Sequence, residues 1–342
     1  MTNPLVNPPA QPTPPGAFRF NTEVGQLEYY DGNQWAYVTC DTPDLHTGGT
    51  RGITWGGNSS PANINVIQYY NISTTGDATD FGDLSYKAST ALSCASRTRG
   101  IYAGGEISPQ VNTIEYITIS STGDAQDFGD ISSGSNAHGS GCCANATRGL
   151  LLGGYLSPAK RNTIEYITIA HKGNTVDFGD LSVAKDANMT SASPTRALTF
   201  GGNAPGSSSL IEYVEINTLG NSATFGDLTA NCDNGGGCSN AIRAVHMGGE
   251  FPGSAGVTID YMTIATLGDA LDFGDLLTAR LGAHGGAASG TRAVTAGGAS
   301  PTQQIQMEFV QIMSTGNAQV FGDLLAAQQY GCTISNGHGG LG

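Results

Sequence analysis

The tripeptide Phe-Gly-Asp occurs six times in this chain of 342 residues, at an almost constant interval. Successive copies are 47, 50, 47, 48 and 48 residues apart, and their phenylalanines are Phe81, Phe128, Phe178, Phe225, Phe273 and Phe321. Self-similarity with a period of about 20–50 residues is typical of architectures in which one small unit packs against copies of itself. The chain is therefore predicted to contain six structural repeats, numbered 1 to 6 by these phenylalanines.

Two further features keep the same period. Paired glycines begin at Gly56, Gly104, Gly153, Gly201, Gly248 and Gly297. Five residues before each pair is an arginine, and these are Arg51, Arg99, Arg148, Arg196, Arg243 and Arg292. Between the glycines and the tripeptide lies an alternating apolar segment, NTIEYITI at both 112–119 and 162–169. This constant order indicates that each repeat has the same strands and turns.

The sequence of repeat 2 predicts four strands. Residues 100–103 are apolar, residues 113–119 alternate with the period of two typical of a strand, and residues 127–131 follow the turn sequence STGDA. Residues 136–145 are predicted as the fourth strand, which leads to the next arginine. Composition agrees, because 50 glycines and a charged fraction of 12% disfavour helices. Four antiparallel strands in about 48 residues are typical of one blade of a β-propeller.

A double glycine that ends one strand, a tyrosine strand about ten residues later and a third strand led by an aromatic residue together resemble a kelch repeat. This chain has phenylalanine where that repeat usually has tryptophan. The resemblance implies an all-β fold, a six-bladed kelch-like β-propeller over residues 41–342. The segment before Arg51 contains a proline and is a poor strand, whereas residues 330–335 have no blade of their own. We therefore expect this C-terminal strand to close blade 1.

The first forty residues differ from the repeats. Six of the 14 prolines fall within residues 4–15, which predicts an extended arm over residues 1–15. Residues 16–40 predict a small β module of three short aromatic strands. About 24 residues bury too little surface to fold alone, so the module is expected to pack on the propeller, another subunit or a different protein. Attachment or oligomerisation is its predicted role.

Part of this module also has a recognisable order of residues, with RFNT at 19–22, YDG at 30–32 and Trp35. It resembles a short segment of bacteriophage tail-fibre and other virion structural proteins. The resemblance implies a structural or adhesive virion component, most simply a tail fibre or tail-associated protein, made in the host cytoplasm. It also implies a homo-oligomer, with a trimer expected. Partners would be other virion proteins through residues 1–40, and a host-surface glycan or protein through the propeller.

Other function classes are disfavoured by charge and by motifs. A net charge of −14 leaves few cations for a nucleic-acid-binding patch, and no apolar run is long enough to span a membrane. The sequence has no nucleophile elbow, HExxH or phosphate-binding loop, so we predict no enzyme activity, catalytic residue, cofactor or metal. The alternatives are a virion decoration or adaptor protein without receptor binding, a glycan-degrading tail enzyme and, third, a cellular kelch scaffold.

Charged residues that recur in every repeat are predicted to be framework, because a binding site on a ring breaks its symmetry. Besides the six arginines, these are Asp83, Asp130, Asp180, Asp227, Asp275 and Asp323. They are expected to tie strands and neighbouring blades through charged hydrogen bonds. A third polar set recurs on the alternating strand, as Gln68, Glu115, Glu165, Glu212, Asp260 and Glu308. Which acid each arginine contacts is left open by the sequence.

Cysteine and aspartate patterns suggest metal sites, but a structural interpretation is preferred for both. Five residues before the arginines stand His46, Cys94, Cys143, Ser191, Cys238 and Ala287. These residues lie on the predicted innermost strand, where small side chains suit a narrow central channel. The alternative is that they form a ring of metal ligands.

Aspartates spaced by three, such as Asp77, Asp80 and Asp83, suggest calcium. Positions three apart on a strand face opposite sides, so turn capping is expected instead.

The loops that follow the double glycines differ between repeats. Loops on a rigid scaffold are where recognition usually occurs. Most of these loops are small and polar, with Tyr155, Lys160, Arg161 and Phe251 as exceptions. These four side chains are predicted to be exposed and are the candidate binding residues.

Overall fold

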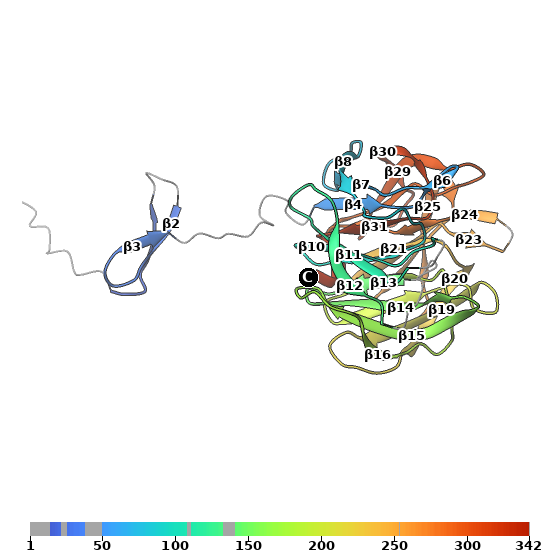
Figure 1. Ribbon diagram of the computed structural model, residues 1–342, viewed down its shortest axis with the longest axis horizontal. Coiled ribbons are helices and arrows are strands. Elements are labelled where there is room, and N and C mark those ends of the chain that lie inside the picture. Colours follow the sequence, from blue (N-terminus) through green and yellow to red (C-terminus); the bar gives the residue numbers. More distant parts are fainter. Residues whose placement is uncertain are drawn as a thin grey trace, which may run out of the picture. The chain divides into compact units, whose positions relative to one another are not determined.

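The computed structural model describes residues 14–21, 26–37, 50–107, 111–132, 141–252 and 254–341. The chain divides into two compact units, Met1–Pro43 and Asp44–Gly342. The helical structure among the described residues is one short 3-10 turn, η2 (Gly339–Leu341). The protein is therefore all-β, with several four-stranded antiparallel sheets (Figure 1).

The first unit contains a three-stranded antiparallel sheet. Its strands are β1 (Phe18–Asn21), β2 (Gln26–Tyr30) and β3 (Trp35–Tyr37). The turn between β2 and β3 is held by Asp31, whose carboxylate accepts two backbone N–H bonds of 2.7 and 2.8 Å. Arg19 pairs with the buried Glu28 and lies over the Trp35 ring, 4.2 Å from its centroid. The residues of the predicted arm before Pro14 lie outside the described residues.

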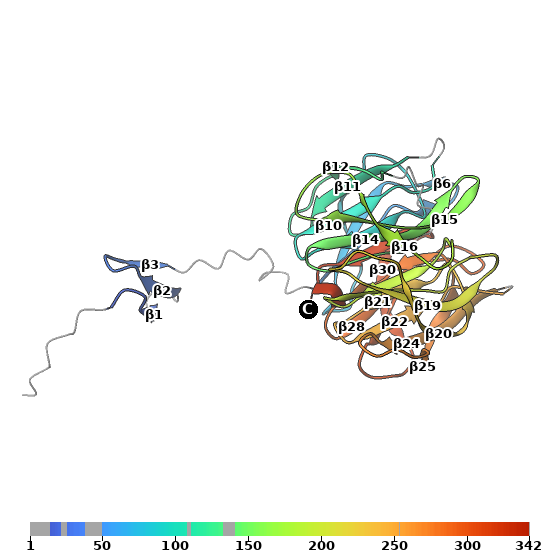
Figure 2. The same ribbon diagram turned by 90° about the horizontal axis from the view of Figure 1, so that it is seen from below.

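The second unit contains one sheet for each repeat, as both views show (Figure 1, Figure 2). In repeats 2 and 3 the strands pair in chain order and are β9 (Leu92–Ala95), β10 (Arg99–Ala103), β11 (Thr113–Thr118), β12 (Gln126–Asp130), β13 (Gly141–Ala144), β14 (Arg148–Leu156), β15 (Ala159–Thr168) and β16 (Val176–Asp180). The strand that we predicted over 136–145 as the fourth of repeat 2 is β13, which pairs with β14 and so belongs to the sheet of repeat 3. Residues 133–140 lie outside the described residues.

Repeats 4 to 6 follow the same plan, with the short β23 added in repeat 5. Their strands are β17 (Met189–Ala192), β18 (Arg196–Phe200), β19 (Ser208–Glu215), β20 (Ala223–Cys232), β21 (Gly236–Ser239), β22 (Arg243–Met247), β23 (Glu250–Phe251), β24 (Ser254–Thr263), β25 (Leu271–Arg280), β27 (Ala287–Ala288), β28 (Arg292–Ala296), β29 (Gln304–Gln311) and β30 (Gln319–Gln328).

Repeat 1 receives a strand from the other end of the chain. Its own strands are β4 (Arg51–Trp55), β7 (Val66–Asn71) and β8 (Thr79–Asp83), with the small hairpin β5 (Asn58–Ser59) and β6 (Ala62–Asn63). β31 (Gly331–Ser335) pairs antiparallel with β4, and β26 (Ala283–Gly285) pairs parallel with β31. The first and last strands of the second unit therefore lie side by side, blue against red (Figure 1).

The third strand of each repeat sheet contains a bulge that turns one polar residue inward. In β11 the register shifts between Ile114 and Glu115, so that both side chains are buried although they are adjacent. The same shift occurs in β7, β15, β19, β24 and β29. The bulge explains why an acid can recur on a strand whose other inward residues are isoleucines and tyrosines.

The phenylalanine of Phe-Gly-Asp is the core residue of its sheet. All six are buried, with 2–4% of the side chain exposed. Each packs edge-on against an aromatic ring of the bulged strand, at 5.9–6.2 Å between centroids. Edge-to-face packing at this separation is favourable beyond the burial of area. Phenylalanine therefore holds the two outer strands of each sheet together.

The glycine of Phe-Gly-Asp brings neighbouring repeats into backbone contact. The N–H of Gly123 in repeat 2 donates to the carbonyl of Phe81 in repeat 1, at 2.8 Å. A Cβ on Gly82 would lie only 2.5 Å from the Gly123 backbone, so no larger residue fits. Equivalent bonds join each repeat to the next, and Gly76 of repeat 1 donates to Phe321 of repeat 6.

The inner strands also contact one another. β31 contacts β9, and the contacts continue through β13, β17 and β21 to β26 and β27, both of which contact β31. The second unit thus consists of sheets whose inner strands adjoin and whose outer strands are joined by the Phe-Gly-Asp backbone.

Candidate functional site

The six recurring arginines each bridge two neighbouring repeats. Each guanidinium lies over an aromatic ring of its own sheet, with the central carbon 4.1–4.8 Å from the ring centroid. Its Nη1 donates a hydrogen bond of 2.6–3.1 Å to a backbone carbonyl of the adjoining repeat. In order from Arg51 to Arg292, the acceptors are Ile119, Ile169, Ile216, Ile264, Ile312 and Ile72. The partners at the joint are therefore a ring and a carbonyl, and Arg196 also pairs with Glu215 at 2.8 Å.

The six Phe-Gly-Asp aspartates join the repeats through their backbone. Each N–H donates to a side-chain oxygen in the turn of the next repeat, at 3.0–3.1 Å. The accepting residues are Asp124, Asn174, Asn221, Asp269, Asn317 and Asp77. Turn capping was the role expected of aspartates such as Asp77, and the structure shows in addition that its side-chain oxygen accepts from the Asp323 N–H of the neighbouring repeat. Since asparagine replaces aspartate at three of the six, the joint requires an oxygen and not a charge.

The polar residue of the bulged strand reaches across the same joint. All six side chains are buried, with at most 5% exposed. Five of them accept a hydrogen bond from a backbone N–H of the adjoining repeat. The pairs, with the donor first, are Leu325 and Gln68, Ser85 and Glu115, Ser182 and Glu212, Thr229 and Asp260, and Leu277 and Glu308. A buried carboxylate needs such donors because it has lost its water.

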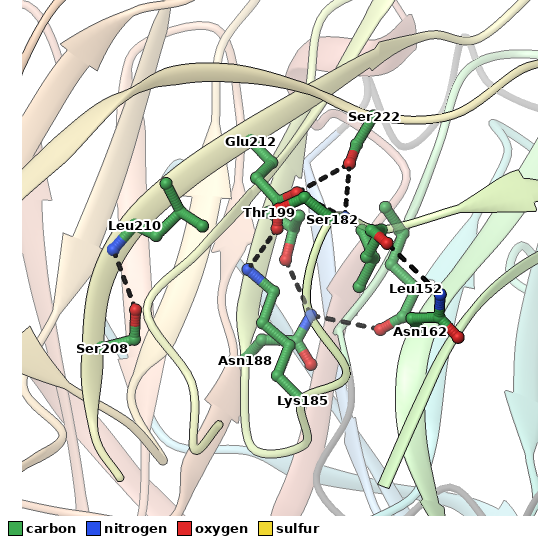
Figure 3. A network of polar contacts seen from close by, with 11 residues as sticks. Leu152, Asn162, Ser182, Lys185, Asn188, Thr199, Ser208, Leu210, Glu212 and Ser222 are labelled. Carbon is green, nitrogen blue, oxygen red and sulfur yellow. Dashed lines mark hydrogen bonds and ion pairs between the residues drawn. The ribbon is translucent and has the colours of Figure 1, made fainter. Parts of the chain in front are cut away.

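Between repeats 3 and 4 the buried acid meets a buried base (Figure 3). Lys185 Nζ lies 3.0 Å from Glu212 Oε2, and the two side chains are 1% and 0% exposed. Burial raises the pKa of Glu212, but the Lys185 charge and hydrogen bonds from Ser182 and Ser222 outweigh burial and leave the pKa below its usual value. Burial lowers the pKa of Lys185, and Glu212 opposes this shift. The pair therefore cross-links repeats 3 and 4.

Other joints use different partners at the same place. Arg280 forms a buried ion pair with Glu308 between repeats 5 and 6, and the Gln68 amide donates to the Gln328 side-chain oxygen at 2.9 Å between repeats 6 and 1. Sequence analysis missed these partners. They share one position, the fifth residue after the Phe-Gly-Asp aspartate. The signal in the sequence was a base at this position in repeats 3 and 5, ahead of Glu212 and Glu308, and an amide in repeat 6, where the facing residue is Gln68.

The four candidate binding residues are partly buried, so the prediction that they are exposed was wrong. Lys160 Nζ pairs with Asp186 at 3.1 Å and donates to the carbonyl of Asn203, at 2.9 Å, in the next repeat. Phe251 packs against the core of repeat 4, with its ring 6.4 Å from that of His246. Tyr155 and Arg161 lie on the long hairpin of β14 and β15. Lys160 and Phe251 contact the neighbouring repeat, and all four side chains are therefore only partly exposed to solvent.

Five of the six small inner-strand residues lie on adjoining inner strands, which line a cavity of about 70 Å³. Ile334 of β31 takes the corresponding place in repeat 1, and His46 lies outside the described residues. Burial raises the pKa of Cys238 and of Cys332 to about 12, so these thiols stay protonated at neutral pH. In the part of the chain that the structure describes, no group of three His, Cys, Asp or Glu side chains could hold a metal ion.

The C-terminal segment packs over one end of the inner strands. His338 lines the cavity, with Nε2 2.7 Å from the carbonyl oxygen of Ala95, while Nδ1 accepts from the N–H of Gly340 at 3.2 Å. A Cβ on Gly340 would lie 1.8 Å from the Ala144 carbonyl oxygen, and Gly339 is as close to Asn240. Glycine is therefore required for the segment to reach repeats 3 and 5.

A second hollow, of about 470 Å³, lies between repeats 3 and 4. It is lined by the loop after the double glycine of repeat 4, by Val183 and Lys185 of repeat 3, and by Asp227 and Asn231 of β20. The Ser209 hydroxyl donates to Asp227 Oδ1 at 2.9 Å. Polar side chains thus meet aliphatic ones in a recess at the loop end of the sheets.

Comparison with known proteins assigns no family. No family model matches the chain, and no curated protein is significantly similar to it. Within the described residues, no helix has the length and apolarity needed to cross a membrane.

Proposed function

We propose that the second unit is a six-bladed, kelch-like β-propeller closed by its C-terminal strand. Support comes from interactions that recur at the joints and also link repeat 6 to repeat 1. These are the bonds from Gly76 to Phe321, from Arg292 to Ile72 and from Leu325 to Gln68. The pairing of β31 with β4 adds a fourth strand to repeat 1. A closed ring has no exposed sheet edge at a seam, which disfavours aggregation.

We infer that the chain is a structural and adhesive component of a bacteriophage virion, a tail fibre or tail-associated protein. The observation that favours this most is the first unit. The residues on which the resemblance to virion proteins rests are those that hold its sheet, since Asp31 forms the turn and Arg19 stacks on Trp35. A role as a small attachment module would need that sheet. Residues 1–40 would bind other virion proteins and form the homo-oligomer, a trimer.

The propeller would contact the host surface through its loop end. β4 starts at Arg51, opposite Asn71 near a turn, and runs to Trp55 beside the double glycine. The loops that differ between repeats follow the double glycines, and loops on a rigid scaffold are where recognition usually occurs. Nine of the 14 cations, the six arginines with Lys160, Lys185 and Arg280, are engaged between repeats. The remaining surface favours neutral partners over polyanions, and several copies together would supply useful affinity.

The test is deletion of residues 1–40. The shortened chain is expected to remain folded and monomeric, to be absent from purified particles and to bind host cells weakly. Mass spectrometry of particles and a cell-binding assay measure both effects, with the full chain as the reference. Normal incorporation of the shortened chain would contradict the attachment role. If neither form binds cells while the full chain enters particles, the adaptor alternative replaces adhesion.

A further inference from the structure

The hollow between repeats 3 and 4 contains groups that the joints do not require. We propose that it is a binding subsite for a neutral saccharide, an inference that rests on the adhesive role proposed above. Its volume of about 470 Å³ falls within the range of roughly 300–1,000 Å³ that is usual for small-ligand sites. Three polar residues of repeat 4, Ser209, Asp227 and Asn231, line the hollow together with aliphatic side chains.

The first step is that repeat 4 departs from the other repeats here. At the position of Ser209, repeats 1 and 3 have Asn65 and Asn162, whose amides donate to a carbonyl of their own repeat at 3.2 and 3.4 Å. Ser209 instead donates to the carboxylate of Asp227. The position of Asn231 is alanine in repeats 3, 5 and 6, as Ala184, Ala279 and Ala327. Other repeats also vary, with Val257 and Ile305 at the first position in repeats 5 and 6, and Lys87 and Gly134 at the second in repeats 1 and 2, but the combination of Ser209 and Asn231 occurs in repeat 4 alone.

The second step is the chemistry of these groups. Asp227 and Asn231 are exposed, lie four residues apart on β20 and line the same hollow. Ser209 orients one oxygen of Asp227, and the other has no hydrogen-bond partner among the described residues. A carboxylate accepts and an amide both donates and accepts, as neighbouring sugar hydroxyls do. The side chains of Val183, Pro205 and Leu210 supply aliphatic surface for the C–H groups of a sugar ring.

The third step concerns charge. Lys185 also lines the hollow, is buried and is ion-paired with Glu212, so its positive charge is already neutralised (Figure 3). An ammonium has three donors, and the contact with Glu212 at 3.0 Å engages one of them. Asp227 and the net charge of −14 repel acidic sugars. The combination selects a neutral saccharide.

The experiment applies the full-length oligomer to an array of neutral and acidic glycans, followed by titration with the best neutral glycan. Asp227→Ala combined with Asn231→Ala should weaken binding at least tenfold. Asp275→Ala is the matched control, because Asp275 is exposed, occupies the same place in repeat 5 and has the same backbone bond to the next turn. Its affinity should stay within twofold of the wild type. Asn231→Ala alone, which leaves Asp227 in place, should also weaken binding if the double variant folds poorly.

Each outcome separates this inference from the proposed function. Binding of neutral glycans that is lost only in the hollow variants supports the subsite. Binding restricted to acidic glycans, or unchanged in the hollow variants, overturns the subsite and leaves the adhesive role in place. If the full chain binds neither glycans nor host cells, both the subsite and the adhesive role are wrong.

Discussion

The residue that faces each buried acid decides how a joint is stabilised. Lys185 and Arg280 pair with Glu212 and Glu308, whereas Gln328 bonds to Gln68. Removing one member of a buried ion pair leaves a charge without a partner in a medium of low polarity. The same position accepts the neutral pair Gln328 and Gln68. A joint can therefore be stabilised either by a buried ion pair or by a hydrogen bond between two amides.

Lys185→Met is therefore expected to lower the free energy of unfolding by about 3–5 kcal/mol, because Glu212 would remain buried without its base. Denaturant titration measures the change. Lys87→Met is the control, since Lys87 is exposed and its loss should cost less than about 0.5 kcal/mol. Adding Glu212→Gln to Lys185→Met should restore most of the stability, and a double variant no better than the single one would contradict the account.

His338 predicts a pH dependence of stability. Burial lowers its pKa from 6.5 to about 4, with Arg97 contributing and the Ala95 carbonyl opposing. Because the unfolded chain binds this proton more readily, the contribution of His338 is complete above pH 6.5 and is lost as the pH falls towards about 4. Across that window the loss would be up to about 3 kcal/mol.

His338→Gln should remove this part of the pH dependence, while a glutamine amide can still donate to the Ala95 carbonyl. Thermal denaturation at several pH values compares the two chains. Parallel stability profiles between pH 4 and 6.5 would show that His338 is not the titrating group.

At the level of elements, the strands and turns were predictable because their signals are local. The alternation of Thr113 to Ile119 and the glycine of STGDA indicated β11 and its turn. The bulge between Ile114 and Glu115 was not predictable, because the pattern there resembles ordinary alternation with one polar residue. Contacts between neighbouring repeats were expected of the recurring arginines, but their partners were not predictable, since Arg51 meets Ile119 across 68 residues and only the packed sheets bring them together.

Two glycines at one joint test the backbone contact. Gly129 and Gly173 have nearly the same φ, 153° and 152°, so alanine is strained at both, by about 1 kcal/mol. A Cβ on Gly129 would lie 2.4 Å from the Gly173 carbonyl oxygen, whereas a Cβ on Gly173 meets nothing within 4 Å. Gly129→Ala is expected to cost roughly 2–3 kcal/mol more than Gly173→Ala in thermal or chemical denaturation. Equal costs would contradict the close contact.

At the scale of the whole molecule, the repeat period indicated six units, and the surplus segment 330–335 indicated a strand for repeat 1. The candidate site was less predictable. Tyr155 and Phe251 were chosen because they are bulky, but both are partly buried, and Phe251 packs against the core of repeat 4. The hollow is formed by small residues such as Ser209 and Asn231, which become a group only when repeats 3 and 4 meet.

Deleting residues 329–342 removes β31 and the segment that packs over the inner strands. The exposed edge of β4 should then cause aggregation, or the melting temperature should fall by roughly 10 °C or more. The control is deletion of residues 1–40, which belong to the other unit and should leave the melting of the repeats unchanged. A chain without residues 329–342 that stays as soluble and stable as the full chain would contradict closure.

The central claim, that this chain is a propeller-bearing part of a virion, is tested most directly by electron cryomicroscopy of particles purified from an infected culture. The account predicts several copies of the chain on the tail or another surface appendage, each with a six-bladed disc joined to the particle through the module of residues 16–40. Particles that lack the chain, or that contain it without such a disc, would contradict the account.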